Sequence, residues 1–211
     1  MNVEQFIERL GGIALRNVFN PYRDQCAEHD HLNSASIRRM NLRNYIQAAH
    51  DCGAESVWLG RDCGYRGGRR TGIALTDEFH LPILNSQFGI RGTQKATLGG
   101  TLKERTATEV WKIIREVDQR IFLWNVFPFH PFEEGNPMSN RRHTLREFEQ
   151  CKDLLLELLE WLRPRRIITL GADAHKGIAR LGLTASLVRH PSYGGHLEFA
   201  AAIRRLYTPS I

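Results

Sequence analysis

The chain has 211 residues, of which 42% are hydrophobic and 25% charged, and its formal net charge is +6. This length allows one sizeable α/β domain, so we expect a single domain over residues 1–211. The composition is that of a soluble globular protein, and no apolar run approaches the roughly 18 residues of a membrane span, so no membrane partner is expected. The moderate basic charge permits nucleic-acid binding without proving it.

The N-terminal residues lack the basic and apolar regions of a signal peptide, which predicts a cytoplasmic protein. Four cysteines are scattered along the chain, at Cys26, Cys52, Cys63 and Cys151. None belongs to a Cys-x-x-Cys pair, so the spacing predicts free thiols, no zinc or iron–sulfur site and no cofactor.

Hydrophobic periodicity predicts strands that alternate with helices along most of the chain. Helices are expected at 3–15, 35–52, 106–118, 144–162, 172–181 and 196–206, and strands at 55–60, 121–128, 167–171 and 185–188. The stretch 61–104 has no strong period, and we expect it to wrap one face of the sheet. This alternation predicts an α/β fold, with a parallel sheet that has helices on both faces.

A loop rich in glycine and arginine follows the first predicted strand. It carries four arginines and a single carboxylate, Asp62. Glycines let a backbone approach a partner closely, and arginines suit a polyanion. The alternative interpretation is a solvated basic turn that an aspartate caps.

Three of the predicted strands end in residues that can carry chemistry. Asp62 follows the first, Asn125 lies within the second, and His190 follows the fourth. Because the carboxyl ends of parallel strands share one edge of a sheet, we expect these side chains to converge on one small molecule. Each residue alone is more often a satisfied structural residue, so the prediction rests on the three together.

From about residue 55 to 205, the sequence resembles the uracil-DNA glycosylase superfamily. The resemblance rests on Gly-Arg-Asp-Cys-Gly-Tyr at 60–65 with Arg-Arg-Thr-Gly at 69–72, Trp-Asn-Val-Phe-Pro at 124–128, Ser-Asn-Arg at 139–141 and His-Pro-Ser at 190–192. It implies a three-layer αβα fold with a central four-stranded parallel sheet. It also implies an enzyme that flips a damaged base out of DNA and cleaves its glycosidic bond.

The resemblance implies a role for each matching position. Asp62 would assist water attack, Asn125 would read the uracil edge, and His190 would steady the leaving uracil oxygen. Substrate binding would further involve Gly60, Arg61, Cys63, Tyr65 and Leu75. Contacts to DNA would come from Arg66, Arg69, Arg70, Arg141, Arg189, Ser192, Tyr193 and Gly194, with Tyr193 as the wedge that replaces the flipped base.

The loop departs from the family pattern in ways that leave alternatives open. Cys63 stands where proline is usual, and a second alignment would put Arg61 at the position of the acid. Leu75 stands where relatives place a phenylalanine that stacks on uracil. Thermophilic-type branches of the family carry four clustered cysteines for an iron–sulfur cluster, and the scattered cysteines of this chain do not match that spacing.

The sequence therefore predicts a monofunctional uracil-DNA glycosylase that acts as a monomer on uracil-containing DNA and releases abasic-site DNA. No lysine is well placed after the strand ends for a Schiff base. Two alternatives are a protein that binds uracil or abasic sites with poor turnover, and an α/β enzyme acting on a free nucleoside or nucleotide.

Overall fold

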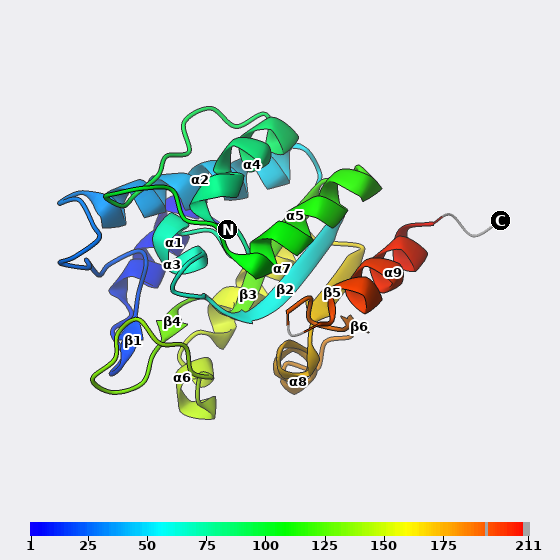
Figure 1. The fold of residues 1–211 in the computed structure, drawn as a ribbon. Coiled ribbons are helices and arrows are strands. Elements are labelled where there is room, and N and C mark those ends of the chain that lie inside the picture. Colours follow the sequence, from blue (N-terminus) through cyan, green and yellow to red (C-terminus); the bar gives the residue numbers. More distant parts are fainter. Residues whose placement is uncertain (193, 209–211) are drawn as a thin grey trace.

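The computed structural model describes residues 1–192 and 194–208, and it forms three layers in which a sheet lies between helices (Figure 1). The sheet has the strand order β3-β2-β5-β6, and every neighbouring pair is parallel. The strands are β2 (Ser56–Asp62), β3 (Ile121–Phe127), β5 (Arg166–Leu170) and β6 (Ser186–Val188). The structure confirms the α/β class and the four-stranded parallel sheet.

Helices cover both faces of this sheet (Figure 1). Trp58 of β2 packs edge-on against Phe199, with ring centroids 5.9 Å apart, on the face covered by α5 (Arg105–Val117) and α9 (His196–Tyr207). Val126 of β3 points to the opposite face, towards α7 (Lys152–Leu162) and α8 (Ala172–Arg180). Every residue of β3 is buried, as is typical of strands in a sheet covered on both sides.

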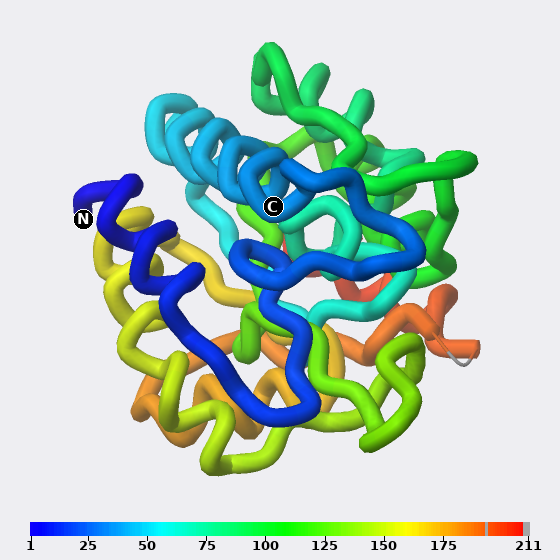
Figure 2. The backbone as a smooth tube through the Cα atoms, turned by 90° about the vertical axis from the view of Figure 1, so that its left-hand side faces the viewer, coloured from blue at the N-terminus to red at the C-terminus, as the bar shows by residue number. Residues whose placement is uncertain are grey.

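Helix α2 (Ser34–Asp51) protects the free edge of β3, and α1 (Val3–Gly12) lies beside it (Figure 2). The Tyr45 hydroxyl accepts a hydrogen bond from the Leu123 amide at 2.7 Å and donates to the Ile121 carbonyl at 3.3 Å. These bonds satisfy backbone groups that an edge strand otherwise leaves open.

A short antiparallel pair lies outside the main sheet. β1 (Val18–Phe19) pairs with β4 (His130–Pro131), and this pair ties the loop that follows β3 to the N-terminal segment. Two-residue strands are too short to produce a hydrophobic period, so the sequence did not predict them.

The stretch 61–104 is more regular than expected. It contains α3 (Gly68–Thr71), the 3-10 helix η1 (Glu78–His80) and α4 (Leu81–Phe88). Pro82 lies in the first turn of α4, and Gly89, with φ +64°, ends it. These two residues are therefore start and stop signals of a helix.

The helix expected over 144–162 is divided into α6 (Leu145–Glu149) and α7. Thr144 caps α6 in a capping box with Glu147. One hydrophobic core runs from Phe6 in α1 to Ile203 in α9. In the part of the chain that the structure describes, none of the helices has an apolar stretch long enough to cross a membrane.

Gly177 of α8 lies against the sheet, so a substitution at this position tests how closely the helix packs on it. A Cβ at this position would lie 2.5 Å from Cγ1 of Val126. We expect Gly177→Ala to lower the free energy of unfolding by about 1–3 kcal/mol, because overpacking a filled core displaces its neighbours. Urea denaturation followed by circular dichroism measures the loss.

Gly12→Ala is the matched control, since a Cβ at Gly12 would meet no described atom within 4 Å. We expect its stability to be unchanged or slightly raised. Equal midpoints for Gly177→Ala and the wild type would contradict the close contact between α8 and β3.

Candidate active site

The carboxyl ends of β2 and β3 bring together three of the predicted site residues. Gly60 pairs with Asn125 in the sheet register, and Asp62 pairs with Phe127. Because side chains alternate along a strand, Gly60, Asp62 and Asn125 all belong to the same face of the sheet. Arg61 and Asp62 are the last residues of β2 and do not lie in the loop after it.

Asn125 is almost completely buried, with 1% of its surface exposed. Its Nδ2 donates to Sγ of Cys63 at 3.3 Å, whereas its Oδ1 has no hydrogen-bond partner among the described residues. The Oδ1 atom occupies the space that a Cβ of residue 60 would need, and that Cβ would also lie 3.0 Å from Cδ2 of Leu75. Glycine at position 60 therefore makes room for the amide and for Leu75.

Cys63 acts as a packing and hydrogen-bonding residue at this point. Its thiol donates to the Pro128 carbonyl at 3.2 Å, and burial raises the pKa of the thiol to about 12. The protonated thiol is a poor nucleophile. The four cysteines are free thiols, and no group of three or more metal-ligating side chains occurs in residues 1–192 and 194–208.

Asp62 has few exposed atoms, since only 5% of its side-chain surface is accessible. Its Oδ2 accepts a hydrogen bond from Nε of Arg61, and its Oδ1 contacts Nδ1 of His143. Arg61 also donates to Asp173, at the start of α8, at 3.1 Å. His143 and Asp173 lie far from Asp62 along the chain, and no local pattern in the sequence indicated either contact.

His190 is half-buried and lies in the segment that directly follows β6. Its Nδ1 accepts from the Ser192 amide at 3.2 Å and lies 2.7 Å from the Ser192 hydroxyl. Burial, and then the nearby charge of Arg61, lower the pKa of His190 to about 4. The ring is therefore neutral near pH 7, and because Nδ1 is an acceptor, the ring proton is on Nε2.

A second carboxyl group, Glu104, lies over the glycine-rich loop. A Cβ at Gly64 would lie 2.7 Å from Oε1 of Glu104, and a Cβ at Gly67 would overlap Oε2. Burial, and then the charge of Asp77, raise the pKa of Glu104 to about 7. At least two glycines of this loop thus make room for a side chain of this chain, and no signal in the sequence indicated that contact.

Two arginines expected to bind DNA are buried within the fold, which corrects that prediction. Arg69 is 4% exposed; it donates to the Pro137 carbonyl and covers the Phe19 ring at 4.0 Å. Arg70 is 5% exposed and pairs with the carboxylate of Glu78 at 3.2 Å. Buried guanidinium groups with internal partners are not available to phosphates.

Arg141 is also engaged within the protein. Its guanidinium pairs with Glu147 at 2.6 Å and donates to the carbonyls of Phe132 and Asn17. Two of the predicted DNA-binding arginines remain on the surface. Arg66 lies 5.4 Å above the Tyr65 ring, and Arg189 is 54% exposed near Glu198.

The remaining predicted DNA contacts lie in the segment after His190. Ser192 is half-buried against His190, and Gly194 is exposed with φ +81°. Tyr193, the predicted wedge, lies outside the described residues. Tyr65, predicted to bind substrate, is half-buried, and its amide donates to Oδ1 of Asn140 at 3.2 Å.

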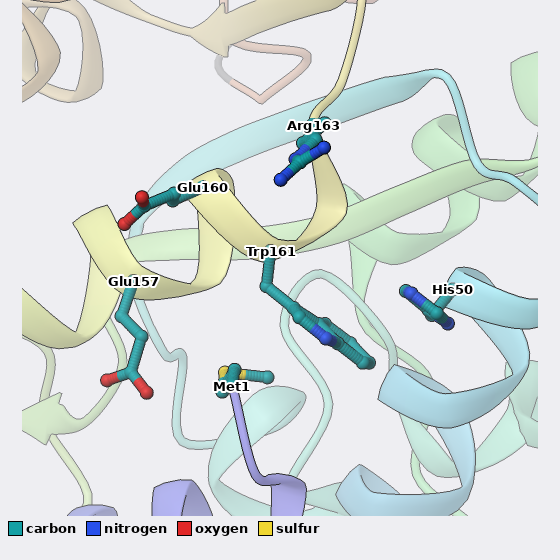
Figure 3. A pocket seen from close by; sticks show the side chains of 6 residues that line it. All are labelled: Met1, His50, Glu157, Glu160, Trp161 and Arg163. Carbon is teal, nitrogen blue, oxygen red and sulfur yellow. The ribbon is translucent and has the colours of Figure 1, made fainter.

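A surface hollow of about 440 Å³ lies elsewhere on the molecule (Figure 3). Trp161 and His50 stack in it with ring centroids 4.1 Å apart. His50 is near the end of α2, before β2 begins, and Trp161 is near the end of α7, before β5 begins. The hollow is therefore at the amino edge of the sheet, away from Asp62, Asn125 and His190.

The fold and these strand ends define an α/β protein with a candidate ligand site at the carboxyl edge of a parallel sheet. The family model of the uracil DNA glycosylase superfamily matches residues 52–210. The chain therefore belongs to the uracil DNA glycosylase superfamily. Membership supports a DNA glycosylase role, with DNA as the partner.

A crystal structure of wild-type SMUG2 from Pedobacter heparinus has a similar fold, with a TM-score of 0.62 over 97% of each chain. The two sequences are 14% identical, so this similarity shows the fold alone. No match to the sequence was found among curated proteins.

His130 makes the stability of the site loops depend on pH. The ring is fully buried, with Nε2 bonded to the Ser139 carbonyl at 2.7 Å and Nδ1 facing Arg69 at 3.1 Å. Burial, and then the charge of Arg69, lower its pKa to about 4. The unfolded chain therefore binds this proton first, and stability falls as the pH drops from about 6.5 to about 4.

We expect His130 to account for up to about 3 kcal/mol of this acid-induced loss, and His190 to act in the same sense. Urea titrations across the pH range measure the effect. In His130→Gln, the free energy of unfolding should be lower, and the slope of this free energy against pH should be shallower on the acid side. The exposed variant His31→Gln should keep the wild-type slope. If His130→Gln also keeps that slope, the buried neutral state of His130 is refuted.

Proposed function

We propose that this protein is a monofunctional DNA glycosylase that flips uracil out of DNA and hydrolyses its N-glycosidic bond. The observation that carries the proposal is the buried Oδ1 of Asn125, which has no partner among the described residues. An unpaired buried acceptor costs about 1–3 kcal/mol, so its presence at the sheet edge supports a ligand that donates a hydrogen bond there. The N3–H group of uracil is such a donor, and the second Nδ2 proton of Asn125 suits the neighbouring uracil oxygen.

The two other strand-end residues suit the charges that develop when the bond breaks. The electrons of the C1′–N1 bond move to the base, and positive character remains on the sugar. The neutral His190 can donate its Nε2 proton as a hydrogen bond to the base oxygen that gains charge. Asp62 can stabilise the cationic sugar and orient the water that attacks C1′.

The accessible residues around this edge suit the DNA backbone. Arg66, Arg189, Ser192 and Gly194 are the proposed contacts, with Tyr193 as the proposed wedge. Phosphate contacts fix the register of a protein on DNA and offset the few kcal/mol that base flipping costs. We further propose that the chain acts as one domain and as a monomer.

Oligonucleotides with one uracil test the proposal directly. With enzyme in excess, we expect an alkali-sensitive break at the uracil and none at thymine. His190→Ala should slow single-turnover cleavage by about 10²–10³-fold, as expected when a donor to a developing anion is lost. Asp62→Asn should also slow cleavage, with the melting temperature retained.

His31→Ala, in an exposed loop, is the control and should cleave at the wild-type rate. Absence of any break with the wild-type enzyme in excess would refute uracil excision. A wild-type rate for Asp62→Asn would refute the role of that carboxylate.

One observation favours a second function, a protein that binds uracil or abasic sites with poor turnover. Both oxygens of Asp62 already have partners in Arg61 and His143. Less than one turnover per enzyme, together with tight binding of abasic product DNA, would support this alternative. Multiple turnovers would exclude it.

A further inference from the structure

The contact between His143 and Asp62 joins the end of β2 to a loop that is distant in sequence. Nδ1 of His143 meets Oδ1 of Asp62, and the two residues are 81 positions apart. The side chains are 11% and 5% exposed, respectively. Since Nε of Arg61 binds the other oxygen, Asp62 is held from two sides.

Two aromatic rings fix the orientation of the His143 imidazole. Phe127 of β3 stacks on it with centroids 5.1 Å apart and planes inclined by 28°. Phe148 of α6 also stacks on it, at 6.0 Å and 28°. The ring therefore has little freedom to turn away from Asp62, and its contact with the carboxylate does not depend on an exposed, mobile side chain.

The backbone on both sides of His143 is anchored as well. Before it, Arg141 bonds to Glu147 and to the Asn17 and Phe132 carbonyls. After it, Thr144 caps α6 and its amide donates to Glu147 at 2.7 Å. A network of satisfied polar groups thus holds this turn in one geometry.

We propose that His143 is a positioning residue that orients the Asp62 carboxylate for the excision reaction, an inference that rests on the proposed function. With Nδ1–H donated to Oδ1, and Nε of Arg61 bound to Oδ2, the plane of the carboxylate is fixed relative to the sheet edge. Each carboxylate oxygen retains a second acceptor site for the attacking water. His143 thereby sets the direction from which water is held, without itself touching the substrate.

The matched pair His143→Phe and His143→Asn separates this role from packing. Phenylalanine preserves the aromatic stack and removes the donor, whereas asparagine keeps a donor near the position of Nδ1 and removes most of the stack. We expect His143→Phe to lower the single-turnover excision rate by about 100-fold, the size of effect that a misplaced reacting group produces. His143→Asn should recover most of that rate.

The affinity for DNA should not change in either His143 variant. Both variants should bind DNA containing a non-cleavable 2′-fluoro-2′-deoxyuridine with the wild-type Kd. In the Asp62→Asn background, His143→Phe should cause no further loss of rate, because the two residues act through one contact. If His143→Phe lowers the melting temperature, that loss should persist in the Asp62→Asn background, whereas the rate loss should not.

Each remaining result contradicts the inference in a distinct way. A wild-type rate for His143→Phe means that the ring only packs. An equally slow His143→Asn means that the hydrogen bond is not what matters. Absence of excision by the wild-type enzyme refutes the proposed function itself, and this inference with it.

Discussion

The parallel pairing of β2 with β3 is the constraint on which the candidate site depends. This register sets Gly60 opposite Asn125, and the amide oxygen fits only because residue 60 has no Cβ. A shift by one residue would put the Arg61 side chain in its place and turn every side chain of the strand to the other face. The buried pairing of β3, which Tyr45 protects at its open edge, therefore positions the residue that we propose reads the base.

Several arginines of this chain form ion pairs within the fold and do not contribute a free charge to the surface. Arg38 pairs with Asp30, Arg70 with Glu78, and Arg141 with Glu147. Arg38 and Arg70 are almost fully buried. A buried guanidinium needs internal partners, and those partners fix the loops that surround the strand ends. These pairs are neutral and leave the net charge of +6 unchanged, but their guanidinium groups are not free to bind phosphates.

Local sequence signals were sufficient to predict the fold, but only part of the site. The four strands and most helices follow from hydrophobic runs and caps, and the strand ends locate Asp62, Asn125 and His190. Burial of Arg69 and Arg70 depends on residues such as Pro137 and Glu78, and no local pattern shows such contacts. His143 was missed for the same reason, because its partner is 81 positions away. A glycine-rich loop suggests an approaching ligand, yet Gly64 and Gly67 make room for Glu104.

The most direct test of this account is a crystal structure of the protein bound to DNA that contains 2′-fluoro-2′-deoxyuridine. We predict an extruded uracil whose N3 lies within hydrogen-bond distance of Oδ1 of Asn125, with Nε2 of His190 at the base oxygen next to the sugar and Asp62 on the sugar side. A uracil that remains stacked in the duplex, or a base bound away from Asn125, would contradict the account.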